Sequence, residues 1–254
     1  MSFHVLGGQL NFVISFICLL TSHHSISSTL AGSDAGALRE PMENINRVTS
    51  TTSGIFGNTW SQNLVNTLNM TDYLKEIIDN QPLINEGMFS SSMGKKLRIV
   101  SKMMLLNEER KKNRDIFLVS KGGFDGHALS KSGLAGLLPD VNSGLAAFYK
   151  EMKDQNMIDD VTTVVISEFG RTVTPNSGLG NDHGWGGHAF LFGGQVNGSQ
   201  ILGHYPESFD NSDITNIGRG RVLPQNSWES MWYGVSNWYG IIDDKELEYV
   251  IPNK

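Results

Sequence analysis

The stretch TTVVISEFGRTVTPNSGLGNDHGWGGHAFLFGG (residues 162–194) decides the fold that this sequence predicts. Its β-branched run Val164-Val165-Ile166 predicts a buried strand, which ends next to Glu168. A glycine-rich loop follows and contains Asp182-His183 and then His188. Ligands of open α/β sheets gather at the carboxyl ends of the strands. Carboxylates and imidazoles at such an edge are ordinary ligands of divalent metals, so we expect the functional centre here.

A second stretch of the same kind lies earlier in the chain. The segment DIFLV (residues 115–119) predicts a strand, and GGFDGH (residues 122–127) follows it, with Asp125 and His127 two positions apart. Residues 138–157 predict an amphipathic helix, because apolar side chains recur at three- and four-residue spacing. Strand, helix and strand form a βαβ unit, so both polar stretches leave parallel strands at the same edge. We therefore expect them to form one site.

The chain is expected to form one α/β domain over residues 54–254. Interrupted helical periodicity begins at Trp60, a helix is expected over residues 93–112, and a short strand over 189–192. Asn226 or Ser227 is expected to cap a last, tryptophan-rich helix. The tryptophan spacing suits core packing, with a sugar-binding platform as the alternative.

Residues 1–53 show little periodicity and predict a poorly structured or signal-like segment. Their apolar run FVISFICLL (residues 12–20) is too short to span a bilayer. A cleaved signal peptide, a misplaced gene start and a buried strand all remain open as interpretations, so the localisation stays open, with secretion among the alternatives. This run contains Cys18, the single cysteine, so no disulfide can form within the chain.

Composition excludes some classes of function. The 254 residues are 39% hydrophobic and 18% charged, which is typical of a globular protein. The formal net charge is −6 and no basic stripe is present, so the sequence does not predict nucleic-acid binding. The lysines and arginines between residues 95 and 114 are interpreted as a solvated helix face.

Four motifs together resemble a known family. They are GGFDGH (residues 122–127), SEFGRT (167–172), NDHGWGGHAF (181–190) and GRGRVLP (218–224). The chain resembles the bacterial domain-of-unknown-function family numbered fifteen-oh-one, within the alkaline phosphatase-like (sulfatase-like) superfamily. The resemblance covers about residue 60 to the C-terminus. It implies an alkaline phosphatase-like α/β sandwich with a largely parallel sheet and helices on both faces, one or two divalent ions at the strand ends, and hydrolysis of phosphate or sulfate esters.

The resemblance also implies a set of site residues. Glu168 stands where superfamily members have an aspartate, and Phe169 replaces the histidine that follows it. Arg171 is expected to contact an anionic substrate. The implied ligands of the divalent ion, which can be zinc, magnesium, manganese or calcium, are Asp125, His127, Glu168, Asp182, His183 and His188. The structural alternatives are an ion pair of Glu168 with Arg171 and a turn capped by Asp125.

One departure from the family pattern concerns the N-terminus. Family members have an N-terminal strand that ends in a motif with glycine and aspartate, and the superfamily nucleophile follows it. GSDAGA (residues 32–37) follows no predicted strand, so we expect this part of the domain to be missing. Two hypotheses follow: a metal-dependent hydrolase of small anionic esters, or a non-catalytic metal- or ligand-binding remnant. A third, an interaction module, depends on the tryptophan helix alone.

Overall fold

The computed structural model of the protein describes residues 13–20, 35–47, 54–128 and 130–253. They form two compact units, one with β1 and everything from Leu83 onward, the other with α1 and α2. The strands and α-helices in chain order are β1 (Val13–Leu20), α1 (Ala35–Arg47), α2 (Gly54–Asn80), α3 (Ser92–Leu105), β2 (Arg114–Lys121), α4 (Ser130–Asp154), β3 (Val161–Ser167), β4 (Phe190–Gly193), α5 (Trp228–Tyr239) and α6 (Asp244–Val250).

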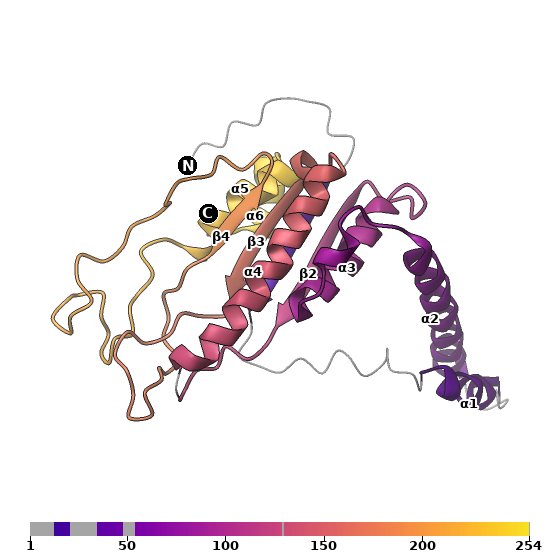
Figure 1. Ribbon diagram of the computed structural model, residues 1–254, viewed down its shortest axis with the longest axis horizontal. Helices are drawn as coiled ribbons and strands as arrows, with labels where there is room; N and C mark the ends of the chain where they lie inside the picture. The colour runs from indigo at the N-terminus through magenta and orange to yellow at the C-terminus, as the bar shows by residue number, and fades with distance from the viewer. Residues whose placement is uncertain (1–12, 21–34, 48–53, 129, 254) are drawn as a thin grey trace. The chain divides into compact units, whose positions relative to one another are not determined.

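The larger unit is built on a four-stranded sheet with the order β2-β1-β3-β4 (Figure 1). β1 pairs in parallel with both β2 and β3, and β4 pairs antiparallel with β3. In this register Leu20 is the partner of Lys121 on one side and of Ser167 on the other. β2 and β3 therefore end at the same edge of the sheet, as the sequence predicted, with β1 between them.

β3 is buried on both of its faces. Val161 and Val165 belong to a core cluster with side chains of α3 and α4, whereas Val164 and Ile166 pack with residues of α5 such as Val235. The alternation follows from the period of two along a strand, and burial of both faces is typical of an inner parallel strand. In Figure 1 α4 and α3 cross in front of β3 and β2, and α5 lies behind β4.

The N-terminal segment differs from the expected poorly structured one where it is described. Val13–Leu20 forms β1 in the middle of the sheet, and Ala35–Arg47 forms α1. The buried-strand interpretation of the apolar run agrees with this position. Five of the eight residues of β1 are Val, Ile or Leu, a composition typical of inner strands of parallel sheets. GSDAGA (residues 32–37) lies partly outside the described residues.

Most of the other predicted elements occur with shifted ends. The helix expected from Trp60 is uninterrupted from Gly54 to Asn80, and the one expected to reach residue 112 ends at Leu105. Ser227 caps α5 by accepting a hydrogen bond from the Ser230 amide, as predicted. The two compact units divide between Pro82 and Leu83, inside the domain predicted over residues 54–254, whose boundary at residues 53/54 stays a prediction.

None of the helices in the described part of the chain is both long enough and apolar enough to cross a membrane, in agreement with the expectation of no transmembrane span. The alkaline phosphatase-like class itself stays a prediction.

Candidate metal site

The end of β2 is fixed by contacts with both helices that cover it. Lys121, the last residue of β2, forms an ion pair with Asp140 of α4 at 2.9 Å. The Lys96 ammonium group of α3 donates a hydrogen bond to the Ser120 carbonyl oxygen at 2.6 Å. Phe124 packs against the core cluster. The GGFDGH loop therefore leaves a rigid strand end and is anchored again at its middle.

The loop that follows β3 folds back on itself. The Gly184 amide donates to the Gly170 carbonyl at 2.8 Å, and the Thr172 amide donates to the Asp182 carbonyl at 2.9 Å. This pairing places His183 opposite Arg171 as an antiparallel bridge. Gly170 is required here, because a Cβ atom on it would lie 1.7 Å from the Gly186 carbonyl oxygen.

The two loops are joined directly. The Asn181 amide donates to the Gly126 carbonyl oxygen at 3.0 Å. Next to this hydrogen bond, a Cβ atom on Gly180 would lie 2.3 Å from the same oxygen, so only glycine permits the close approach. The loop after β3 thus carries Asp182 and His183 to the loop after β2.

Three side chains meet where the loops join. The His127 Nε2 atom lies 3.1 Å from His183 Nε2 and 3.1 Å from Asp125 Oδ1. The third side of the triangle, from His183 Nε2 to Asp125 Oδ1, is 3.2 Å. Among the residues that the structure describes, these three form the one group of acidic, histidine or cysteine side chains with this closeness. We call Asp125, His127 and His183 the triad.

The triad has the donor set and the spacing that suit a divalent cation. Metal–nitrogen and metal–oxygen distances of about 2.0–2.2 Å at tetrahedral angles separate neighbouring ligand atoms by roughly 3.3–3.5 Å. The observed separations of 3.1–3.2 Å are close to this range. Two imidazoles with one carboxylate leave further coordination positions open, as in catalytic zinc and non-haem iron sites. The side chains are 40–51% exposed, so a cation can reach them.

Asp182 lies behind the triad and orients one of its members. Its Oδ1 atom is 3.2 Å from His127 Nδ1 and accepts a hydrogen bond from the Asn176 side chain at 2.9 Å. Its Oδ2 atom pairs with Arg219 Nη2 at 2.6 Å. A carboxylate on Nδ1 selects the tautomer whose Nε2 lone pair faces the triad, which is how outer-shell carboxylates support metal-bound histidines.

Both carboxylates of the site have lowered pKa values. For Asp125 partial burial raises the pKa, but hydrogen bonds from His183 and Arg171 and the positive charges nearby outweigh it. For Asp182 the hydrogen bond from Asn176 lowers the pKa most, followed by that from His127 and the charge of Arg219. Both groups are therefore ionised at neutral pH, as metal ligation and histidine orientation require.

The structure brings together part of the predicted ligand set. Asp182 is an outer partner of the triad rather than a member, since its carboxylate faces His127 Nδ1 and Arg219. Glu168 follows β3 directly and is outside the triad group. His188 is also outside it, and its Nε2 atom is hydrogen-bonded to the Tyr205 hydroxyl.

Arg171 and Phe169 both support the triad. Arg171 donates to Asp125 Oδ1 at 3.1 Å and makes two hydrogen bonds to the Asn181 carbonyl oxygen, at 2.6 and 3.2 Å. Phe169 packs against the His183 ring with 4.5 Å between the ring centroids. Both side chains therefore fix the orientation of a triad member.

Two functional residues escaped the sequence analysis. Asn176 donates to the His127 carbonyl oxygen and to Asp182, and its own side-chain oxygen accepts from the Gly178 and Gly180 amides. The turn sequence Pro-Asn-Ser-Gly could have indicated this role, because asparagine side chains commonly cap such turns. Arg219 belongs to a quoted motif, GRGRVLP, but nothing in its local sequence connects it with Asp182.

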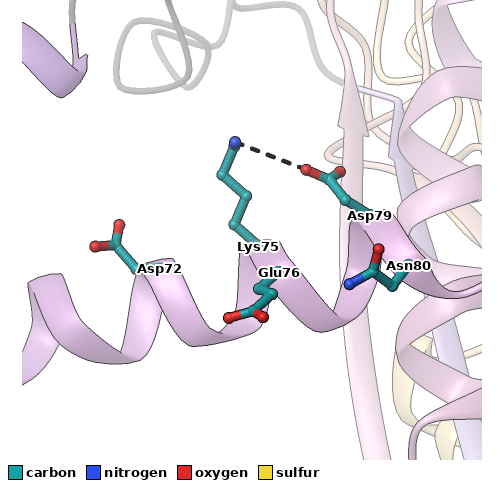
Figure 2. A pocket seen from close by; sticks show the side chains of 5 residues that line it. All are labelled: Asp72, Lys75, Glu76, Asp79 and Asn80. Atoms are coloured by element: carbon teal, nitrogen blue, oxygen red, sulfur yellow. Dashed lines mark ion pairs between the residues drawn. The ribbon is translucent and has the colours of Figure 1, made fainter.

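The structure also has a shallow hollow along α2, in the other unit. Figure 2 shows its lining, which comes from one helix: Asp72, Lys75, Glu76, Asp79 and Asn80. The dashed line in Figure 2 is the ion pair between Lys75 and Asp79 at 3.7 Å. Side chains four residues apart are neighbours on the surface of any helix, and oppositely charged ones often form such pairs. We therefore interpret the hollow as part of a solvated helix face.

Comparison with known proteins gives a family but no described function. No curated protein and no solved structure matches the chain significantly. The profile of the family described as "Protein of unknown function (DUF1501)" matches residues 83–216, which is more than half of the 254 residues. This range begins later than the resemblance, which started near residue 60, and contains the triad, Asp182 and Asn176. The chain therefore belongs to the DUF1501 family of proteins of unknown function.

Proposed function

We propose that the triad binds one divalent cation and that the protein is a metal-dependent hydrolase of phosphate or sulfate esters. The observation behind this proposal is the triangle of Asp125 Oδ1, His127 Nε2 and His183 Nε2, with sides of 3.1–3.2 Å. Its corners come from loops after two different strands, as is usual for sites at the carboxyl edge of a parallel sheet.

The residues around the triad have separate tasks in this proposal. Asp182 holds His127 in the tautomer that ligates through Nε2. Arg171, through its hydrogen bond to Asp125 Oδ1, keeps that carboxylate ionised and turned toward the two imidazoles. A bound divalent ion would polarise the ester oxygen and lower the pKa of a water molecule, which supplies a nucleophile without a dedicated serine or threonine.

A second function, metal binding without turnover, is favoured by the openness of the site. Each side chain of the triad is at least 40% exposed. Efficient hydrolases exclude bulk water, because electrostatic stabilisation of the transition state is far stronger in a dry site. The two proposals share the cation and differ only in turnover.

Metal content tests the shared part. The purified chain should retain about one equivalent of a divalent ion, or bind one in a titration with Zn²⁺, Mn²⁺, Mg²⁺ or Ca²⁺. His183→Ala should lose this ion, while His204→Ala, which changes a histidine outside the triad, should keep it. Equal metal content in both variants would contradict the site.

Turnover is tested next with the metal-loaded protein. Aryl phosphates and aryl sulfates are offered, and hydrolysis that disappears in His183→Ala but persists in His204→Ala supports the hydrolase. A bound metal with no hydrolysis of either ester class would leave the binding function.

A further inference from the structure

The structure presents a second arginine to the site from an unusual loop. Residues 218–220 all have left-handed backbone conformations, with φ values of +98° for Gly218, +58° for Arg219 and +71° for Gly220. Glycine adopts this conformation readily, but arginine does so at a cost on the order of 1 kcal/mol. A non-glycine residue keeps this conformation only where the surrounding structure holds it there.

Backbone hydrogen bonds hold this loop against the site. The Val173 amide donates to the Gly220 carbonyl oxygen at 2.9 Å, and the Gly186 amide donates to the Val222 carbonyl oxygen at 2.8 Å. A Cβ atom on Gly220 would lie 2.4 Å from the Thr174 amide nitrogen, so the loop packs too closely for any other residue there. The loop is therefore fixed to both flanks of the segment that carries His183.

Arg219 and Arg171 differ in what their guanidinium groups are free to do. Arg171 is 19% exposed and uses all three of its nitrogens in hydrogen bonds to Asp125 and Asn181. Arg219 is 71% exposed, and within the described residues the structure gives it one polar partner, Asp182, at a single nitrogen. A guanidinium group has five N–H donors, so most of those of Arg219 are open to solvent next to Asp182, the outer partner of the triad.

We propose that Arg219 is the anion-binding residue of the site and holds the oxygens of a tetrahedral phosphate or sulfate group. Its planar fork suits two oxygens of such a group, and Asp182 holds it at the site while other donors stay available. The inference deepens the proposed function: it reassigns the anion contact from Arg171, which is 19% exposed and bonded at all three nitrogens, to Arg219, which is 71% exposed. The left-handed loop is explained as the feature that places this side chain against Asp182, the outer partner of the triad.

The experiment measures binding of inorganic phosphate and, separately, of sulfate by calorimetry. Both titrations are made with metal-loaded protein and with protein kept in chelator. Arg219→Ala should weaken anion binding about 10- to 100-fold, which corresponds to losing hydrogen bonds from a charged donor. The matched control is Arg221→Ala, because the Arg221 side chain donates to its own loop, at the Gly218 carbonyl oxygen, and should change anion affinity less than about twofold.

Two further variants separate binding from folding. Arg219→Gly removes the guanidinium group and relieves the left-handed conformation, so it should lose the anion while melting no earlier than the wild type. Arg219→Lys keeps the charge and should retain part of the affinity. Comparison of phosphate with sulfate on the wild type then tells which ester class the site prefers.

The outcomes distinguish this inference from the proposed function. Equal anion affinity in Arg219→Ala and the wild type, in both titrations, would overturn the inference and leave the metal site standing. Absence of metal binding, together with anion binding in chelator that depends on Arg219, would overturn the proposed hydrolase and keep the inference. If Arg221→Ala lost as much anion affinity as Arg219→Ala, the inference would also be overturned. The affinity would then depend on the total positive charge of the loop and not on Arg219 itself.

Discussion

The loops at the sheet edge and helix α2 both gather charged side chains at the surface, but by different means. On α2, Asp72, Glu76 and Asp79 come together because they share one helix. In the triad, His127 and His183 are 56 positions apart and meet only because two loops are hydrogen-bonded to each other. The surface hollow is on α2, but the side chains whose spacing suits metal ligands are in the two loops. Convergence of distant residues is thus a better guide to a site than the shape of the surface.

The sharpest test of this comparison changes one carboxylate in each region. Asp182→Asn removes the charge that orients His127 and should weaken metal binding about 10- to 100-fold, the range found for outer-shell partners. Asp72→Asn on α2 should leave metal affinity unchanged. The measurement is competition for metal with a chelating dye, and equal affinities of the two variants would remove the distinction between the regions.

A second test concerns stability. Glu151 of α4 is fully buried and accepts hydrogen bonds from the Ile84 and Asn85 amides at 3.0 and 2.7 Å, and from the Gln155 side chain at 2.9 Å. Glu151→Gln should destabilise the sheet unit by about 2 kcal/mol, because it replaces one of the buried acceptor oxygens by an NH2 group, which cannot accept the hydrogen bonds donated to residue 151. Urea unfolding measures this, with the exposed Glu76→Gln as control.

The effect of Glu151 should also depend on pH. Burial raises its pKa, but the hydrogen bonds from Gln155, Asn85 and Ile84 outweigh this, so the folded-state pKa is below the usual 4.5. A lowered pKa contributes stability that is fully present above the unfolded-state value and is lost as the pH falls through the folded-state value. The difference between wild type and Glu151→Gln should therefore shrink on acidification below about pH 4.5. A constant difference down to acid pH would contradict the assignment.

The smallest effect is expected on α2. The side chains of Lys75 and Asp79 are 76% and 63% exposed and their charged atoms lie 3.7 Å apart. Asp79→Asn should change the free energy of unfolding by less than about 0.5 kcal/mol, and added salt should remove even that difference. A decrease of more than about 1 kcal/mol in the free energy of unfolding would contradict the interpretation of this face as solvated and without a structural role.

The sequence allowed the edge of the sheet to be predicted because local patterns determine it. The β-branched run of β3 and the apolar run of β2 mark strands, and the glycines after each mark loops. From these alone Asp125, His127 and His183 were expected to meet, and the structure places them within 3.2 Å of one another.

Other features depend on contacts that no local pattern contains. β1 was one of three interpretations of its segment, because an apolar run of this length suits an inner strand as well as a signal peptide. Glu168 was expected as a ligand from its place after β3, but position along the chain does not determine which way a side chain turns. Arg219 could not be connected with Asp182, since the pairing depends on the left-handed backbone at residues 218–220.

The place of β1 has a practical consequence for anyone producing this protein. β2 and β3 do not pair with each other, and each is bonded to β1 instead. Cutting away the first twenty residues to improve expression would leave the two strands about 9–10 Å apart, twice the usual spacing, with unsatisfied amides facing each other. Without β1 nothing would hold the ends of β2 and β3 at a fixed distance, so the loops that follow them would no longer bring the triad residues together. Metal or substrate binding should therefore be tested on protein that retains residues 1–20.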